Sequence, residues 1–311
     1  MTASRDVRRR RRIDGVLLLD KPVGLSSNAA LQSAKRLYRA EKAGHTGTLD
    51  PLASGLLPIC FGEATKFAQS LLDADKAYLA TLRFGITTTT GDRDGEVLAT
   101  RPVQLEQRDL EAVLPRFAGR IEQVPPRHAA LRHQGRRYYE YARRGIEIPR
   151  APRAVEIREL TLCSWRAPQL ALFVRCSKGT YIRALAEDIG IAVQCGAHLE
   201  ALRRVATGGF ALDDALTLEA LEAMSETERD AALRPAEMLV AQLPRLDLEG
   251  LEAYRFVQGQ ALARAALADG LVRVYADGCF AGIAELAEGV LRARRLVSVQ
   301  PASRAIETVE S

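Results

Sequence analysis

His45-Thr-Gly-Thr-Leu-Asp-Pro-Leu-Ala-Ser-Gly55 is the stretch of this chain that concentrates turn residues, hydroxyl groups and a carboxylate. Gly loses backbone entropy in a regular element and Thr competes for backbone hydrogen bonds, so the stretch predicts a loop. Residues 56–61 are apolar and have the length of a buried strand, which would tie the loop to a core. Because sites concentrate on loops held by a rigid scaffold, this loop is the first candidate site.

Asp50 within this loop has two interpretations. An Asp before Pro51 is typical of a helix N-cap followed by Pro at the first helical position, and the pair alone favours that structural role. The neighbouring His45, Thr46 and Thr48 favour a reactive carboxylate, acting as nucleophile or base. No second carboxylate stands at a fixed spacing, as glycosidase chemistry would require. Four scattered histidines give no metal-ligand spacing, so we expect no metal site.

The composition, with 47% hydrophobic and 27% charged residues, is typical of a globular protein. A length of 311 residues predicts one large domain and one small one. No apolar run approaches the roughly 18 residues that span a bilayer, and the basic N-terminus lacks a following apolar segment, so we expect a cytoplasmic protein without a membrane partner. The five cysteines are scattered without a C-x-x-C pair, which fits a reducing compartment.

The charge is unevenly distributed along the chain. Residues 1–12 carry six Arg and one Asp, a net +5 that equals the net charge of the whole chain. Residues 120–153 hold nine Arg and three Glu, whereas residues 213–249 hold ten acids and three Arg. We therefore expect the first twelve residues to form a disordered basic arm and residues 120–153 to offer a phosphate-binding face.

Hydrophobic periodicity predicts an α+β protein with a mixed sheet and flanking helices. The expected strands cover residues 15–20, 56–61, 76–84, 155–165, 170–176 and 198–210, and the expected helices residues 27–39, 66–72, 105–117 and 177–190. After Pro244, short strands and Gly turns predict a small β domain. The expected organisation is a basic arm over 1–12, a large domain over 13–243 that holds the candidate loop, and a small β domain over 244–311.

Two further segments allow alternative interpretations. Residues 138–145 interleave Tyr with Arg, which suits base stacking with phosphate contact, although a helix with a Tyr-lined inner face is the commoner explanation. Asp92 and Asp94 lie in a loop rich in Thr and Gly, where turn stabilisation is their default role.

Five separated motifs resemble those of the TruB family of pseudouridine synthases, in the same order along the chain. They are Asp20-Lys-Pro-x-Gly-x-Ser-Ser27, Gly44-His-Thr-Gly-Thr-Leu-Asp-Pro-Leu-Ala-x-Gly55 with Gly62-Glu-Ala-Thr-Lys66, Lys76-x-Tyr78 with Gly91-Asp-x-Asp-Gly95, Gly179-Thr-Tyr-Ile-Arg183, and His198-Leu-x-x-Leu-Arg-Arg204. The resemblance covers the chain from Asp14 nearly to its end. It implies the pseudouridine synthase fold followed by a PUA-like C-terminal domain, and no cofactor.

The resemblance also implies roles for individual residues. Asp50 resembles the carboxylate that initiates cleavage of the glycosidic bond, and Arg183 resembles its partner. A guanidinium beside Asp50 would lower the pKa of the carboxyl and keep it ionised. Tyr78 resembles the ring that packs on the target base and helps with its proton. The further residues that the resemblance assigns to substrate binding are His45, Tyr181, Leu202, Lys21 and Asp92.

The function implied by the resemblance is isomerisation of uridine 55 in the T-loop of tRNA by base flipping. We expect tRNA, contacted at its T-arm and acceptor end, to be the partner of a monomer that needs no other protein. Two alternatives stay open, namely a tRNA-folding chaperone with dispensable catalysis, and guide-RNA-dependent activity as in dyskerin-like enzymes.

The chain departs from the family pattern after Val124-Pro-Pro126. The family has Tyr-Ser-Ala and then a Lys there, whereas this chain reads Arg127-His-Ala-Ala-Leu-Arg132. His128 and Ala129 therefore replace Tyr and Ser, while Arg132 keeps a positive charge. We expect this to change a contact near the pocket and not the class of activity.

Overall fold

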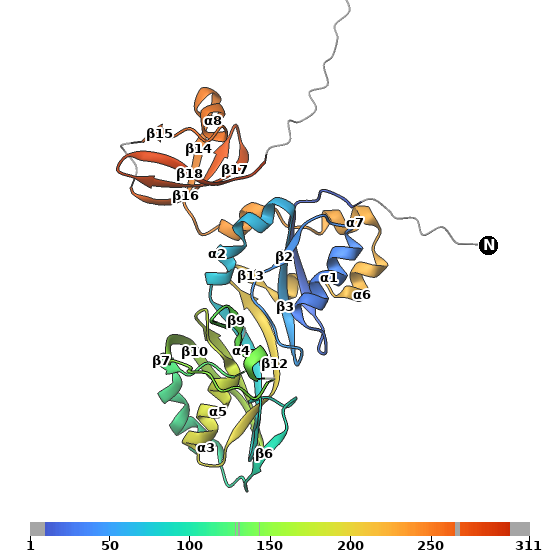
Figure 1. The fold of residues 1–311 in the computed structure, drawn as a ribbon, viewed down its shortest axis with the longest axis vertical. Helices are drawn as coiled ribbons and strands as arrows, with labels where there is room; N and C mark the ends of the chain where they lie inside the picture. Colours follow the sequence, from blue (N-terminus) through green and yellow to red (C-terminus); the bar gives the residue numbers. More distant parts are fainter. Residues whose placement is uncertain (1–9, 128, 130, 143, 265–267, 299–311) are drawn as a thin grey trace, which may run out of the picture.

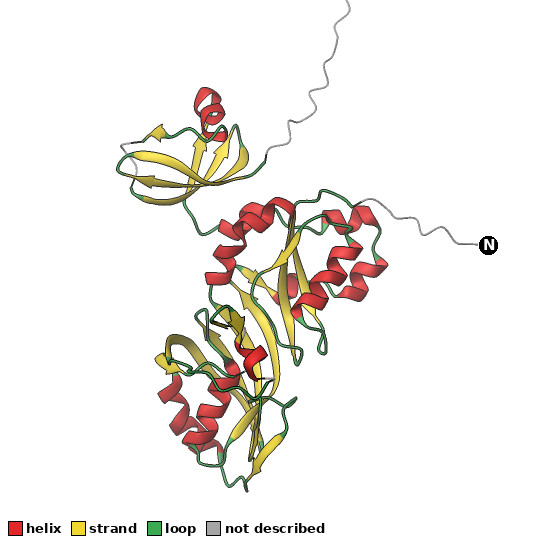
Figure 2. Ribbon diagram, viewed as in Figure 1, coloured by secondary structure: helices red, strands yellow, loops and turns green. Residues whose placement is uncertain are grey.

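The structure, a computed structural model, describes residues 10–127, 129, 131–142, 144–264 and 268–298. A large mixed sheet flanked by short helices forms its main part, and a separate sheet follows at the C-terminal end (Figure 1). Figure 2 shows helices lying against the large sheet near both of its ends. The expected α+β class with a small C-terminal β domain is confirmed. Within the described ranges, no helix is long and apolar enough to cross a membrane.

The strands of the large sheet are β1 (Gly15–Lys21), β2 (Ala43–His45), β3 (Ala53–Phe61), β4 (Lys76–Phe84), β7 (Gly119–Gln123), β10 (Arg153–Arg166), β11 (Gln169–Cys176), β12 (Ala197–Thr207) and β13 (Phe210–Ala211). Their order is β1-β3-β12-β4-β11-β10-β7, with β2 beside β3 and β13 beside β12. Two hairpins stand apart from it, β5 (Ile86–Thr88) with β6 (Val97–Thr100) and β8 (Arg132–His133) with β9 (Arg136–Arg137).

One junction of the large sheet differs from the rest. β12 runs parallel to β3, pairing residues 202–204 with residues 53–55, whereas the other pairings are antiparallel. β12 then continues along β4 in a long antiparallel pairing. The sheet is therefore mixed, as expected, and its parallel step lies directly after the Asp50 loop.

The helices of the main part are α1 (Ser27–Leu37), α2 (Ala68–Asp73), α3 (Gln107–Val113), α4 (Tyr138–Ala142), α5 (Ile182–Ala192), α6 (Leu218–Ala223) and α7 (Glu226–Ala231). Single 3₁₀ turns are η1 (Gly62–Phe67), η2 (Leu114–Phe117), η3 (Leu212–Asp214) and η4 (Ala236–Val240). α1, α6 and α7 lie beside β1, whereas α3 and α5 lie near the other end of the sheet (Figure 1). Apolar side chains from strands and helices form its core, including Leu17, Leu57, Leu82, Leu172 and Leu185.

The N-cap interpretation of Asp50 and one predicted helix start are wrong. Asp50 is no N-cap, because the backbone N–H of Ala53 donates to the Asp50 carbonyl (3.1 Å) in a tight turn and the chain then enters β3. β3 begins at Ala53, three residues before the expected start. The helix expected from Ser177 begins only at Ile182, because Gly179 has φ +81° and Tyr181 is extended. Residues 177–181 form a loop instead.

The structure decides between the interpretations of two polar segments. Tyr138, at the start of α4, is buried, so its ring faces the protein interior and not solvent. Asp92 accepts hydrogen bonds from the Thr90 hydroxyl and from the backbone N–H of Asp94 (3.2 Å), which confirms its turn-stabilising role.

The last residues of the basic arm lie within the described part of the chain. Residues 1–9 lie outside the described residues, but the guanidinium of Arg11 forms ion pairs with Asp230 and Glu226. The backbone N–H of Arg11 also donates to the Arg39 carbonyl (2.7 Å). The acidic segment near α7 therefore neutralises Arg11, while the extent of the disordered arm stays a prediction.

The C-terminal sheet consists of β14 (Arg245–Leu248), β15 (Leu262–Ala263), β16 (Gly270–Ala276), β17 (Cys279–Ala287) and β18 (Val290–Leu296), with the helix α8 (Gly250–Val257), which the sequence did not predict. It has its own apolar core, which includes Leu248, Phe256 and Val274. Phe280 packs against Phe67 of η1, with ring centroids 5.3 Å apart. The domain boundary at residue 244 stays a prediction.

Candidate active site

The Asp50 turn is held against the start of α1. The Ser27 hydroxyl donates to the Leu49 carbonyl (2.8 Å) and accepts from the Leu49 backbone N–H (2.7 Å). The backbone N–H of Gly24 donates to the Pro51 carbonyl (2.7 Å). These bonds satisfy backbone groups that neither helix nor sheet can pair, and they fix the direction of the Asp50 carboxylate.

Arg183 reaches Asp50 from the opposite side, out of the first turn of α5. Its Nη2 lies 3.1 Å from Oδ2 of Asp50, and its Nη1 lies 3.5 Å from Oδ2 of Asp92. Nη1 also donates to the Thr90 carbonyl at 3.1 Å. The buried guanidinium therefore stands between two carboxylates and fixes their positions relative to each other.

The pKa of Asp50 departs from the expectation. Burial raises the pKa of this carboxyl above its ordinary value, and Asp92 adds to the increase, while Arg183 and Lys21 act in the opposite direction. The expected net lowering is therefore wrong, because desolvation in the recessed turn outweighs the guanidinium. The Asp50 side chain nevertheless keeps 40% of its surface exposed, so solutes can reach its oxygens.

A cavity of about 250 Å³ opens beside the Asp50 carboxylate. It is lined by Gly47, Thr48, Leu49, Asp50, Leu72, Lys76, Tyr78, Ala129, Ser177, Gly179, Thr180, Tyr181, Ile182, Arg183, Leu202 and Arg204. Five of the predicted site residues thus meet in one cavity, although they come from separate parts of the chain: Asp50, Tyr78, Tyr181, Arg183 and Leu202. The cavity presents aromatic and aliphatic walls next to a carboxylate, which suits a flat, uncharged ring.

The two tyrosines of the cavity are fixed in different ways. Tyr78 is a buried residue of β4, and burial raises the pKa of its phenol. Tyr181 precedes α5, where its backbone N–H donates to the Gln123 side chain (3.0 Å) and its carbonyl accepts from the same amide group (3.3 Å). Burial also raises the pKa of Tyr181. Both phenols are therefore protonated at neutral pH.

The remaining predicted substrate-binding residues lie outside the cavity lining. His45 is in β2, opposite Ile59 of β3. Lys21 is buried and donates to the carbonyls of Pro22 (2.8 Å) and Leu25 (2.6 Å), and burial lowers the pKa of its ammonium to about 8. Asp92 forms an ion pair with Arg183 and does not line the cavity. Their contact with substrate stays a prediction.

Sequence reasoning missed several residues of the cavity. Lys76 and Arg204 line it although no role was expected of them, and both lie inside the recognised motifs. The register of β12 against β4, which places Arg204 opposite Tyr78, was not available from the sequence. Ala129, part of the departure after Pro126, is buried and faces the cavity. His128 and the side chain of Arg132 lie outside the described residues.

Comparison with protein-family models gives three consecutive matches. Residues 35–182 match the "TruB family pseudouridylate synthase (N terminal domain)". Residues 183–241 match the "tRNA pseudouridylate synthase B C-terminal domain", and residues 244–297 match "Pseudouridine synthase II TruB, C-terminal".

Curated proteins similar over most of their length include two named "tRNA pseudouridine synthase B". The protein from Thiobacillus denitrificans (strain ATCC 25259 / T1) is 58% identical over 290 residues, covering 93% of this chain and 97% of that protein. The protein from Burkholderia mallei (strain NCTC 10247) is 55% identical over 296 residues, covering 93% and 98%.

Solved structures with a similar fold belong to larger assemblies. A Cbf5–Nop10–Gar1 complex contains a chain with TM-score 0.68 and 26% identity, over 87% of this chain and 78% of that one. A chain of an H/ACA RNP bound to a substrate RNA containing 2'-deoxyuridine has TM-score 0.69 at 24% identity, over 92% and 85%. The second likeness concerns the fold alone.

Proposed function

Because the chain belongs to the TruB family of pseudouridylate synthases, we propose that it converts uridine 55 in the T-loop of tRNA to pseudouridine, with Asp50 initiating the reaction. The observation that carries the assignment is the pairing of Asp50 with Arg183 at 3.1 Å, beside Tyr78 in one cavity. The coarser part, a tRNA-modifying isomerase, rests on relatives more than half identical over nearly their whole length.

The target base reaches the cavity by leaving the RNA stack. Extrusion of a nucleotide costs a few kcal/mol, which stacking on aromatic and apolar side chains offsets. Tyr78, Tyr181 and Leu202 supply such surfaces around Asp50. The cavity is slightly smaller than the roughly 300–1,000 Å³ of drug-sized ligand pockets, which suits a single extruded nucleoside.

The reaction rearranges one nucleoside without a net change in atoms. The bond from C1′ of the ribose to N1 of uracil breaks, the base turns, and a bond from C1′ to C5 forms. C5 then loses a proton, and N1 gains one. Asp50 starts this sequence either by attack at C1′ or by taking a proton from the ribose, and both steps need the ionised carboxylate.

Arg183 and Asp92 support the ionised form of Asp50. The entering base displaces water from the cavity, which strengthens the attraction between Arg183 and Asp50 because the local dielectric falls. Asp92 shares the same guanidinium and thereby fixes the rotamer of Arg183. The expected result is a carboxylate aimed at the ribose despite its raised pKa.

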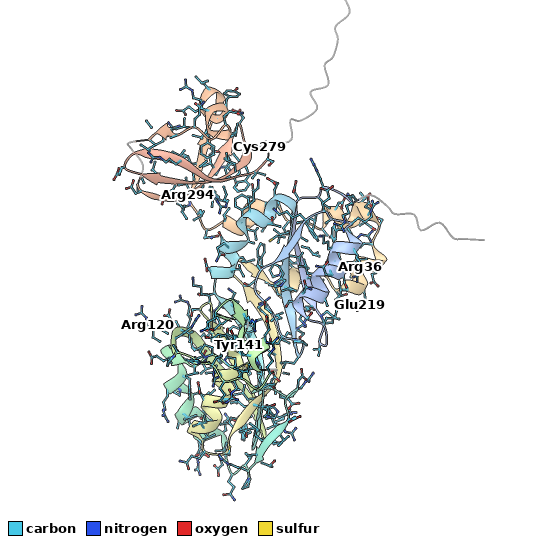
Figure 3. The ribbon with its side chains drawn as sticks, in the orientation of Figure 1. Arg36, Arg120, Tyr141, Glu219, Cys279 and Arg294 are labelled. Atoms are coloured by element: carbon cyan, nitrogen blue, oxygen red, sulfur yellow. The ribbon has the colours of Figure 1, made fainter. Side chains whose placement is uncertain are left out.

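The positive surfaces suit a folded RNA that contacts both parts of the molecule. Arg120 lies at the outer edge of the main part and Arg294 in the C-terminal sheet (Figure 3). Exposed arginines of the same basic segment as Arg120, residues 120–153, are Arg127, Arg136, Arg144 and Arg153, and exposed arginines on the same strand as Arg294, β18, are Arg292 and Arg295. We assign the T-arm to the first group and the acceptor end to the second, since phosphate contacts position an RNA without reading its sequence.

The test uses purified protein and an unmodified tRNA transcript, with no added protein or guide RNA. Pseudouridine is mapped by chemical modification and primer extension. The expected product is a single pseudouridine at position 55, lost in Asp50→Asn and retained in Asp213→Asn, a matched change on the exposed turn η3. Absence of product with the wild-type chain alone, or full product with Asp50→Asn, would rule the proposal out.

The same variant separates the enzyme from a chaperone. Refolding of a misfolded tRNA is measured with wild-type protein and with Asp50→Asn. If Asp50 initiates the reaction, the variant gives no pseudouridine, whether or not it still refolds the tRNA. If Asp50→Asn loses modification and keeps refolding, the chain also acts as a tRNA-folding chaperone that does not depend on catalysis.

A further inference from the structure

Arg204 is a buried cation in the wall of the cavity. It lies in β12 with 1% of its surface exposed, and no carboxylate pairs with its guanidinium in the described part of the chain. Burial of a charge without a counter-charge is costly, and a neutral side chain would fill the same space at lower cost. The charge therefore requires an explanation beyond packing.

The contacts of Arg204 connect the two catalytic segments. Its Nε donates to the Leu56 carbonyl in β3 at 2.7 Å, and its Nη2 donates to the Gly47 carbonyl in the Asp50 loop at 3.1 Å. Arg204 also lies directly opposite Tyr78 in the β12–β4 pairing, so the two side chains leave the same face of the sheet, and both line the cavity. Arg204 thus contacts the Asp50 loop and lies beside the base-stacking tyrosine.

Backbone register explains how one side chain reaches both. Arg204 is paired with Tyr78 of β4 on one side and with Gly55 of β3 on the other. Gly55 has φ +100°, and a Cβ there would lie 2.3 Å from the Arg204 carbonyl. A Cβ on Gly47 would lie 3.3 Å from Nη1. Two glycines of the opening motif therefore leave room for this arginine.

We propose that Arg204 is a positioning residue of the reaction, which fixes the Tyr78 hydroxyl relative to the Asp50 loop and keeps a positive charge beside the phenolic oxygen. This inference rests on the proposed function. It extends the assigned set of Asp50, Tyr78 and Arg183 by a residue that acts through two of them and does not touch the base itself.

The chemical reason lies in the last proton transfer. Tyr78, protonated in the resting site, first gives its phenolic proton to solvent. When C5 has bonded to C1′, its C–H bond breaks and the proton goes to the Tyr78 phenolate, which restores the phenol. The electron pair restores the C5–C6 double bond, the electrons of the C6–N1 double bond move to N1, and N1 takes up a proton from solvent. Positive charge beside the oxygen favours the phenolate.

Other groups around the Tyr78 hydroxyl disfavour the phenolate. Burial raises the pKa of Tyr78, and Cys176 from β11 and Asp50 from the turn act in the same direction. Arg204 from β12 lowers the pKa by its charge. It is thus the cation that offsets the environment of Tyr78.

The first experiment measures the single-turnover rate of pseudouridine formation and the dissociation constant of tRNA. Arg204→Met removes the charge with little loss of volume, and Arg204→Lys keeps the charge but loses the fork that reaches both carbonyls. We expect Arg204→Met to slow the rate about 100-fold, as for loss of one preorganised donor, with tRNA affinity changed less than threefold. Arg203→Met is the matched control, since Arg203 pairs with Asp20 (2.7 Å) and lies outside the cavity lining.

The second experiment separates charge from structural support. Difluorotyrosine, a more acidic phenol, is incorporated at position 78 in both wild type and Arg204→Met. We expect it to increase the rate of Arg204→Met at least tenfold and to shift the pH–rate profile of that variant toward lower pH. The rate of the wild type should change little. A variant that is merely loosened would show no such rescue.

The outcomes are distinguishable. Thermal unfolding is recorded for each variant, and if Arg204→Met is unfolded, the rate and rescue of Arg204→Lys decide. A wild-type rate in both Arg204 variants, or absence of rescue in a folded variant, overturns this inference alone. Absence of pseudouridine with the wild-type chain overturns the proposed function itself.

Discussion

Asp50 and Arg183 face each other in one cavity, but different kinds of structure hold them. Asp50 stands on an irregular turn that a few hydrogen bonds from Ser27 and Gly24 attach to the protein. Arg183 stands on an 11-residue helix whose apolar face is buried against the sheet. Apolar packing distributes the constraint on Arg183 over many atoms, whereas the Asp50 turn rests on two buried leucines, Leu49 and Leu52, and on the hydrogen bonds of a single hydroxyl. The turn side is therefore where the geometry of the site is vulnerable.

Removal of the guanidinium on the helix side gives the largest expected effect. Arg183→Met leaves Asp50 and Asp92 without the charge that separates them, so the pKa of Asp50 rises further. We expect the single-turnover rate to fall by about 1,000-fold at pH 7, with tRNA binding changed little. A rate within tenfold of wild type would show that the helix side is dispensable.

Release of the turn side should have a smaller effect on rate and a measurable one on stability. Ser27→Ala removes two hydrogen bonds to Leu49 and leaves its buried backbone groups unpaired, at a cost of about 1–3 kcal/mol in the free energy of unfolding. We expect the rate to fall about tenfold, because the direction of Asp50 is less well defined.

The adjacent serine supplies the control for this change. Ser26 caps α1 by accepting from the Ala29 backbone N–H (3.1 Å) and does not contact the turn. Ser26→Ala should cost about 1 kcal/mol of stability and leave the rate unchanged. Equal rates for the two variants would contradict the view that Ser27 orients the site.

The raised pKa of Asp50 predicts a pH-dependent cost in stability. Since the folded-state pKa lies above the ordinary 3.8, the protonated carboxyl favours the fold; this contribution is complete below that value and is lost as pH rises through the folded pKa. Asp50→Asn should therefore raise the free energy of unfolding at pH 7 by an amount that shrinks on acidification. Urea titrations at several pH values measure it, and a less stable variant at pH 7 would show that Arg183 outweighs burial.

The smallest expected effect on chemistry comes from the contact with the C-terminal sheet. Phe280→Ala removes a ring that packs on Phe67 and should lower the free energy of unfolding by about 2 kcal/mol. We expect tRNA affinity to fall a few-fold and the saturated rate to stay within threefold of wild type. A larger loss of rate than in Ser27→Ala would show that the C-terminal contact matters more for the reaction than the support of the Asp50 turn.

Much of the fold follows from local patterns. Burial of one face imposes a period of two on strands such as β4, and the free backbone N–H groups at the start of α1 favour a capping residue such as Ser26. The exceptions are places where the tertiary structure overrides local preference. Asp50 before Pro51 has the chemistry of a helix start, but the pairing of β3 with β12 extends the chain instead. Helix α8 was not predicted, because it lies in a segment where short strands and Gly turns dominate the sequence pattern.

The sequence predicted which residues form the candidate site but not how their surroundings shift the pKa values. Motif order brought Asp50, Tyr78 and Arg183 together, and the cavity contains all three. Distance, burial and register are properties of the fold, so the sequence suggested a lowered pKa for Asp50 where the structure gives a raised one. For the same reason Arg204 was overlooked, since only pairing across β12 and β4 sets it beside Tyr78.

The short run from η1 into α2 joins two distant places. Phe67 contacts Phe280 of the C-terminal sheet, and five residues later Leu72 lines the cavity beside Tyr78. Lys76 donates to the carbonyls of Leu72 and Ala74 (both 2.6 Å), which fastens the end of α2 to the strand that carries Tyr78. The packing of the C-terminal sheet and the lining of the cavity therefore depend on one continuous stretch of the chain, residues 67–76.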